Sequence, residues 1–307
     1  MTSLRMHEND VHLREYFLRR NRIQQYLDED IGRGDITSEL VVPNNLWSEA
    51  SVWCKVSTDG VVLCGMEEAC IALELCGCPT RKLVPDGMIL NDDQKVISIT
   101  GNARALLKAE RTALNLLMRM SGIATESRRC MEVLRRLGID ALVTATRKTS
   151  PGMRVFDKKA VMTGGGYPHR MRLDDMILIK DNHIALVGTA SDCIRNARKH
   201  AGTNTKIECE VRSTDELVSA VLAGADIVML DNFSVENAKN ALSRLQELGL
   251  RNRIQVEISG KINASNIRDY ALLKPDLLSI GYLTHSSRAI DFSLDVSPRA
   301  ESTALET

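Results

Sequence analysis

The stretch from residue 206 to residue 232, KIECEVRSTDELVSAVLAGADIVMLDN, decides the fold class of this chain. It contains an apolar run over 206–211, a helix-length segment over 214–223 and a second apolar run over 225–232. Apolar runs of this length, bounded by turn residues, are typical of buried strands. The stretch therefore predicts a strand, a helix and a second, parallel strand, which is the repeating unit of an α/β fold.

The same rhythm extends through the C-terminal half of the chain. Helix-length segments at 185–200 and 235–248 separate further apolar runs, which are ALVTATRK (141–148), MILIKD (176–181), IQVEIS (254–259) and DLLSIGYL (276–283). Nearly every run ends in ionisable or small polar residues, and such residues at the carboxyl ends of parallel strands are typical of the active face of an α/β barrel. An open doubly wound sheet also binds ligands at its strand ends, but at one switch point. We expect an incomplete α/β barrel, with the open sheet as the alternative.

The N-terminal half follows a different pattern. Residues 51–100 contain short β-like runs separated by turns, with one helix predicted over 66–75. A helix is expected over 11–27, and an amphipathic helix over 103–120. The pair Ser121-Gly122 predicts a break, after which Thr125 would cap a second helix that ends at Gly138. With 307 residues, the chain suits one large domain and a smaller one.

Cations are concentrated in one part of the chain. The protein has 40 basic and 40 acidic residues, yet TRKTSPGMR (146–154) and VMTGGGYPHRMRLDDMILIKDNH (161–183) are rich in arginine, lysine and histidine. A neutral chain that gathers cations locally indicates an anion-binding pocket rather than a nucleic-acid surface. The three glycines of 164–166 would let the backbone approach the anion. The separate cluster Arg19, Arg20 and Arg22 is interpreted as a solvated helix face, with polyanion binding as the alternative.

Composition also bounds the location of the protein. No apolar run has the length of a membrane span, and the first residues lack the apolar segment of a signal peptide. The eight cysteines lack the paired spacing of a metal site. We expect a reduced, cytoplasmic protein that binds neither membrane nor nucleic acid.

Several segments, in this order, resemble the quinolinate phosphoribosyltransferase family. They are DEDIGRGDITS (28–38), LKAERTALNLLMRMSGIAT (107–125), TRKTSPGMR (146–154), GGGYPHR (164–170), LIKDNHI (178–184), ECEV (208–211), ADIVMLDNF (225–233) and GYLTHS (281–286). The resemblance covers the chain from about Ile23 to about Leu294.

This resemblance implies a domain organisation. The family has an α/β sandwich domain and an incomplete α/β barrel, which would occupy residues 23–122, including a linking helix, and residues 123–294. Residues 1–22 would form an N-terminal helical extension and 295–307 a tail, and the last strand or helix could return to the sandwich. The family also implies a homodimer, or a higher oligomer built from dimers, with active sites shared between subunits.

The resemblance further implies a reaction and its residues. Members join quinolinate to phosphoribosyl pyrophosphate with Mg²⁺, giving nicotinate mononucleotide, pyrophosphate and CO₂ for NAD biosynthesis. Quinolinate would be bound by Arg111 of the neighbouring subunit and by Arg147, His169, Arg170 and Lys180. Lys148 would contact phosphoribosyl pyrophosphate, and Glu210 and Asp231 would hold Mg²⁺ and the ribose hydroxyls, so these three form the expected catalytic set. The 5′-phosphate would bind near Ser259, Gly260, Gly281 and His285.

The chain departs from the family pattern at three positions. Lys261 stands where a second glycine is usual, Pro168 where asparagine is usual, and Met162 where many members have arginine. Substrate preference is therefore open, and the alternatives are a relative that acts on another aromatic acid and a non-catalytic paralogue.

Three assignments of individual residues also stay open at this stage. Either Glu208 or Glu210 could be the working acid, because they face the same side of a strand. The residues Asp181, Asn182 and His183 could belong to the site or simply form a turn and cap. His285 could be a cap or a phosphate donor.

Overall fold

The computed structural model describes residues 2–55, 60–202 and 205–298. Within them the chain forms two compact units: the first runs to Thr125 and resumes at Arg288, and the second is Glu126–Ser287. No helix in the described part of the chain is long and apolar enough to span a membrane. All eight cysteines are free thiols.

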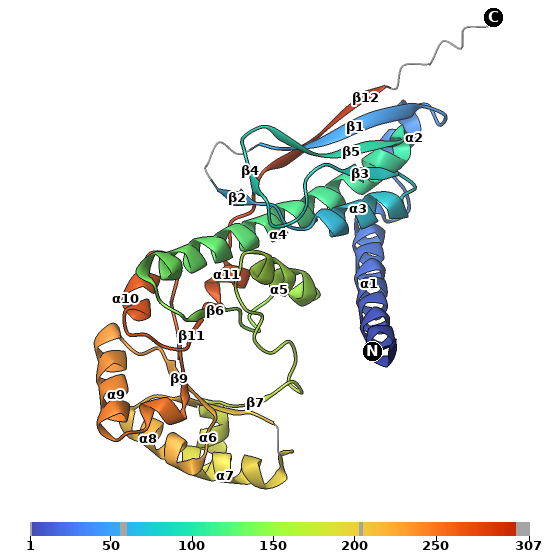
Figure 1. Ribbon diagram of the computed structural model, residues 1–307. Coiled ribbons are helices and arrows are strands. Elements are labelled where there is room, and N and C mark those ends of the chain that lie inside the picture. Colours follow the sequence, from blue (N-terminus) through green and yellow to red (C-terminus); the bar gives the residue numbers. More distant parts are fainter. Residues whose placement is uncertain (1, 56–59, 203–204, 299–307) are drawn as a thin grey trace, which may run out of the picture. The chain divides into compact units, whose positions relative to one another are not determined.

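The first unit is built on a four-stranded antiparallel sheet (Figure 1), in the order β12-β1-β5-β3. Its strands are β1 (Trp47–Cys54), β3 (Thr80–Lys82), β5 (Gln94–Asn102) and β12 (Phe292–Pro298), and β2 (Val61–Val62) pairs separately with β4 (Ile89–Leu90). Alternate residues of β1 are buried, as one covered sheet face requires. Of the predicted tail, 295–298 belong to β12, and 299–307 lie outside the described residues.

Three helices belong wholly to the first unit: α1 (Thr2–Ile31), α2 (Ile36–Val41) and α3 (Met66–Leu75). The prediction over 66–75 is confirmed, and the N-terminal helix is longer than expected. Arg19 was predicted on a solvated face, but its guanidinium lies 2.7 Å from a carboxylate oxygen of Glu67 and 3.0 Å from one of Glu68. This arginine therefore joins α1 to α3 instead of facing solvent.

The predicted helix break at Ser121-Gly122 is wrong, because α4 (Ala103–Leu137) is continuous. The Ser121 hydroxyl accepts the Cys64 N–H and donates to the Cys64 carbonyl, and the Thr125 hydroxyl accepts the Val62 N–H. Gly122 is required for a close approach rather than for a turn, since a Cβ there would lie 2.0 Å from the Arg288 carbonyl oxygen. These residues bind neighbouring backbone without interrupting the helix.

The second unit contains a six-stranded parallel sheet in the order β6-β11-β10-β9-β8-β7. The strands are β6 (Leu142–Thr144), β7 (Ile177–Ile179), β8 (Ile207–Val211), β9 (Ile227–Asp231), β10 (Gln255–Ser259) and β11 (Leu277–Ser279), so all six predicted strands are confirmed. The first strand of the series pairs with the last, as in a barrel, whereas β6 and β7 are the two edges. The fold is therefore the expected incomplete α/β barrel, with its gap between β6 and β7.

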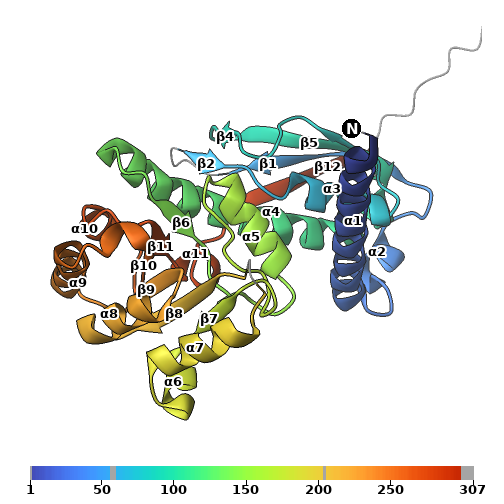
Figure 2. The ribbon, with the colours of Figure 1, turned by 60° about the horizontal axis from the view of Figure 1, so that its bottom comes forward.

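Helices cover the outside of this barrel, and α7, α8 and α9 lie in a row along the strands (Figure 2). The helices of this unit are α5 (Arg154–Thr163), α6 (Asp181–Val187), α7 (Ala190–His200), α8 (Thr214–Ala223), α9 (Val235–Glu247), α10 (Ile267–Ala271) and α11 (Tyr282–His285), with a 3-10 turn at Arg251–Arg253. The single helix predicted over 185–200 is two helices, because Gly188 adopts φ +120° and Thr189 caps α7. Apolar side chains of the central strands, such as Val228 and Val256, are fully buried.

Candidate active site

A cavity of about 740 Å³ lies at the carboxyl ends of the barrel strands. Residues that follow or end each of the six strands line it, including Arg147 after β6 and Gly281 after β11. Every predicted site residue except Arg111 is on its wall: Arg147, Lys148, His169, Arg170, Lys180, Glu210, Asp231, Ser259, Gly260, Gly281 and His285. Arg111 belongs to the first unit, where its side chain is 58% exposed and lies 3.8 Å from Glu110.

Two arginines form a partly desolvated part of this wall. Arg170 is buried, and Arg147 is half-buried, with an Nε that has no hydrogen-bond partner among the described residues. Burial and the nearby Arg147 charge lower the pKa of Arg170. Two partly desolvated guanidinium groups whose charges repel each other favour an anionic ligand beside them.

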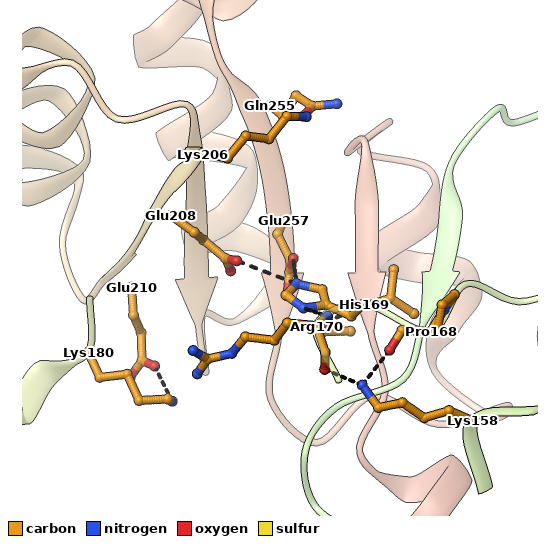
Figure 3. A network of polar contacts seen from close by, with 12 residues as sticks. Lys158, Pro168, His169, Arg170, Lys180, Lys206, Glu208, Glu210, Gln255 and Glu257 are labelled. Carbon is orange, nitrogen blue, oxygen red and sulfur yellow. Dashed lines mark hydrogen bonds and ion pairs between the residues drawn. The ribbon is translucent and has the colours of Figure 1, made fainter. Parts of the chain in front are cut away.

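His169 is fixed by two buried carboxylates (Figure 3). Its Nε2 lies 3.1 Å from an oxygen of Glu257 and 3.4 Å from an oxygen of Glu208. Burial disfavours the imidazolium, but the hydrogen bonds to these carboxylates outweigh it and raise the pKa of His169 to about 9. In the neutral ring, Nδ1 accepts the Arg170 N–H at 2.8 Å, and the single proton then lies on Nε2, facing the carboxylates.

The two candidate acids on β8 have separate places. Glu208 is fully buried beside His169, and its burial together with the Glu257 charge raises its pKa. Glu210 lines the cavity and accepts a hydrogen bond from the Lys180 ammonium at 2.8 Å. The structure therefore presents Glu210 to a ligand, and it uses Glu208 to hold the histidine.

Asp231 ends β9 and lines the same cavity. Its carboxylate accepts a hydrogen bond from the Asn232 amide at 2.6 Å, and Asn232 itself adopts φ +57°. Gly260, with φ +104°, lies against this asparagine: a Cβ at Gly260 would lie 2.4 Å from the Asn232 side-chain oxygen. The glycine is thus required for the backbone of the β10 loop to pass so closely.

The remaining wall is formed by the loops after β10 and β11. Lys261 adopts φ +52° and faces the cavity, and the Lys148 side chain approaches Gly281. His285 is the last residue of α11; its Nδ1 lies 2.5 Å from the Ser286 hydroxyl while the residue lines the cavity. Both alternatives for His285 are compatible with this position.

The alternatives for Asp181, Asn182 and His183 are resolved in favour of a helix cap. The Lys180 N–H donates to the His183 Nδ1 at 2.8 Å, and Asp181 forms an ion pair with Arg212. None of the three lines the cavity.

Two further residues belong to the site or support it but were not predicted: Glu257, which lines the cavity, and Lys158, which does not. Glu257 was seen only as a polar strand end, and Lys158 gave no signal, because a lysine within an amphipathic helix normally faces solvent. Lys158 is instead fully buried. Only the fold shows that both contact the segment around His169.

An incomplete α/β barrel whose strand ends enclose a cavity lined by cations and carboxylates is typical of α/β-barrel enzymes. Residues 35–121 match the N-terminal domain of quinolinate phosphoribosyl transferase, and residues 123–295 match its C-terminal domain. The chain belongs to the quinolinate phosphoribosyltransferase family.

Individual relatives agree with this assignment. The chain is 40% identical over 274 residues to a probable carboxylating nicotinate-nucleotide pyrophosphorylase of Methanothermobacter thermautotrophicus, covering 89% of this chain and 97% of the relative. It is 36% identical over 287 residues to the carboxylating nicotinate-nucleotide pyrophosphorylase of Mycobacterium leprae, covering 92% and 98%. The solved nicotinate-nucleotide pyrophosphorylase of Francisella tularensis superposes with a TM-score of 0.80 at 34% identity, over 90% of this chain and 94% of that one.

Proposed function

We propose that this protein transfers the phosphoribosyl group of phosphoribosyl pyrophosphate to quinolinate and removes one carboxyl group as CO₂, giving nicotinate mononucleotide for NAD biosynthesis. The observation that carries the proposal is one cavity lined by Arg147, His169, Arg170 and Lys180 together with Lys148 and the carboxylates of Glu210 and Asp231. Family membership and the names of the relatives support the same reaction.

The quinolinate end of the cavity is assigned to the arginines and His169. Quinolinate carries two adjacent carboxylates, and a guanidinium matches a carboxylate with two parallel hydrogen bonds. Arg147 and Arg170 are already desolvated, so these bonds would be stronger than at an exposed site. The site should therefore bind a ring with two carboxylates more tightly than a ring with one, because the second ligand would leave one buried cation unpaired.

Arg111 would act in the active site of a partner subunit. Its side chain is exposed on a helix of the first unit. Among the described residues, its one ion-pair partner is the neighbouring Glu110. In a homodimer with shared sites, this arginine would complete the quinolinate pocket of the other subunit. A larger assembly built from such dimers is an extension of the same proposal.

Glu210 and Asp231 fit Mg²⁺. They are carboxylates on neighbouring strands, both on the cavity wall, and Mg²⁺ prefers oxygen ligands from one or two carboxylates together with substrate phosphates. The ion would neutralise the pyrophosphate and the charge of the leaving group. Lys180, which now pairs with Glu210, would be free to bind a substrate carboxylate when a cation occupies that acid.

The residues of this chain then act through position and charge. The quinolinate nitrogen attacks the anomeric carbon, the bond to pyrophosphate breaks, and the nearby carboxylates stabilise the cation-like sugar. Loss of CO₂ from the carboxylate next to the ring nitrogen leaves an electron pair on that carbon, which then takes a proton. The surrounding cations and the positive ring nitrogen stabilise this charge, and no covalent nucleophile is needed.

The test is turnover with defined substrates. Purified protein with Mg²⁺ and phosphoribosyl pyrophosphate is given quinolinate, nicotinate or another ring acid, and labelled CO₂ and nucleotide are measured. We expect product and CO₂ in equal amounts from quinolinate and little turnover of nicotinate. Folded protein that uses another aromatic acid would identify the related transferase, and inactivity with every acid would identify the non-catalytic paralogue.

A further inference from the structure

Lys158 occupies an environment that lysine normally avoids. It lies in α5 between Phe156 and Ala160, and all three residues are fully buried. A buried ammonium is costly unless its protons meet hydrogen-bond acceptors. Burial and the Arg154 charge lower the pKa of Lys158 to about 8. An apolar side chain of similar length would fill the same space without burying a charge, so packing alone does not explain a lysine at this position.

The ammonium of Lys158 contacts one short segment of backbone. It donates to the Pro168 carbonyl at 2.5 Å and also to the Arg170 carbonyl (Figure 3). The residue between these carbonyls is His169, which adopts φ +53°. A non-glycine residue in this conformation persists only where its surroundings hold it there.

The other side of this segment is held by the carboxylates described above. His169 contacts Glu257 and Glu208, and its ring accepts the Arg170 N–H. The turn is therefore fixed through its carbonyls by a lysine and through its histidine ring by two acids. His169 and Arg170 both reach the cavity, whereas Lys158 does not line it.

We propose that Lys158 is a positioning residue for the dicarboxylate subsite: its ammonium holds the Pro168 and Arg170 carbonyls so that His169 and Arg170 face the carboxylates of the substrate. This inference rests on the proposed function, because it takes the ligand of that subsite to be quinolinate. It assigns no part in bond making to Lys158. Within the described residues, the Lys158 ammonium donates to the Pro168 and Arg170 carbonyls and not to the loops after β10 and β11, so those loops should keep their geometry without it.

The first test replaces Lys158 and compares the two substrates. Lys158→Met keeps the length of the side chain and removes its donors, and Lys239→Met, on the exposed side of α9, is the matched control. We expect the KM for quinolinate to rise by about 10-fold or more in Lys158→Met, with the KM for phosphoribosyl pyrophosphate within about twofold of the wild type. Lys239→Met should leave both constants unchanged.

A double-mutant cycle separates positioning from general loss of stability. If Lys158 acts through the turn, adding Lys158→Met to His169→Ala should raise the KM for quinolinate by much less than it does in the wild type. Equal effects in the two backgrounds, or equal rises in the two substrate KM values, would overturn the proposal. If Lys158→Met is insoluble, Lys158→Gln, which keeps a donor for one carbonyl, replaces it. The double-mutant cycle with His169→Ala and the outcomes that would overturn the proposal stay the same.

The wild type distinguishes the two levels of inference. Absence of quinolinate turnover by folded wild-type protein contradicts the proposed function. Normal wild-type turnover, together with an unchanged quinolinate KM in folded Lys158→Met, contradicts only the role of Lys158.

Discussion

The two ends of the cavity are built by different means. At the end where we propose that quinolinate binds, long cationic side chains are placed by buried partners, such as the lysine and the carboxylates around Pro168–Arg170. At the other end, where we propose that the 5′-phosphate binds, short loops after β10 and β11 line the cavity, and Gly260 is packed against Asn232. The first end depends on charge and its supports, and the second depends on the absence of side chains. Substitutions at the two ends should therefore have separable effects.

Removal of Mg²⁺ should produce the largest effect and should separate the ends most clearly. With a chelator present, we expect turnover to be abolished, because the pyrophosphate charge is no longer neutralised. Binding of quinolinate alone, measured by calorimetry, should change by less than about threefold, since its cations belong to the protein. Equal turnover with and without chelator would contradict the metal assignment of Glu210 and Asp231.

Arg170→Met should produce the next largest effect, at the quinolinate end. Removing one partner of a buried guanidinium–carboxylate pair costs about 2–5 kcal/mol, so the KM for quinolinate should rise by about 30-fold or more. Steady-state kinetics with each substrate varied in turn would measure this. A comparable rise in the KM for phosphoribosyl pyrophosphate would show that the ends are not separable.

Gly260→Ala should act at the other end. The new Cβ would meet Asn232 at 2.4 Å, and the loop would have to move. We expect kcat/KM for phosphoribosyl pyrophosphate to fall by about 10- to 100-fold, while the affinity for quinolinate is little changed. Gly224→Ala is the control, because Gly224 also has a positive φ (+96°) but has open space around its Cβ position. If both variants behave alike, backbone strain and not the contact with Asn232 explains the result.

Lys261→Gly should give the smallest effect. Lysine at φ +52° is strained relative to glycine, so the change should stabilise the protein by up to about 1 kcal/mol in a denaturant titration. Loss of an exposed ammonium on the cavity wall should raise the KM for phosphoribosyl pyrophosphate by only about threefold. A lowered KM would mean that Lys261 obstructs the phosphate.

The sequence predicted the barrel strands and the residues at their ends because both depend on local pattern. Apolar runs identify buried strands, and the last residues of each run must lie at the carboxyl edge, as Lys148 and Asp231 do. The choice between a barrel and an open sheet could not be made in this way, because it depends on the pairing of β6 with β11, which is a contact between distant segments.

Tertiary partners explain the failures. Ser121 and Thr125 bond the backbone near residues 62–64 instead of ending a helix, and Arg19 finds two carboxylates on α3. Lys158 could not be identified at all, because its function depends on carbonyl groups that any residue provides. The domain boundaries and the roles of individual site residues stay predictions.

The most direct measurement is a crystal structure of the protein with quinolinate bound. The account predicts both carboxylates within hydrogen-bond distance of Arg147, Arg170 and Lys180, with the ring nitrogen facing the part of the cavity that Lys148, Glu210 and Asp231 line. Quinolinate bound elsewhere, or bound here with a carboxylate that no cation contacts, would contradict it.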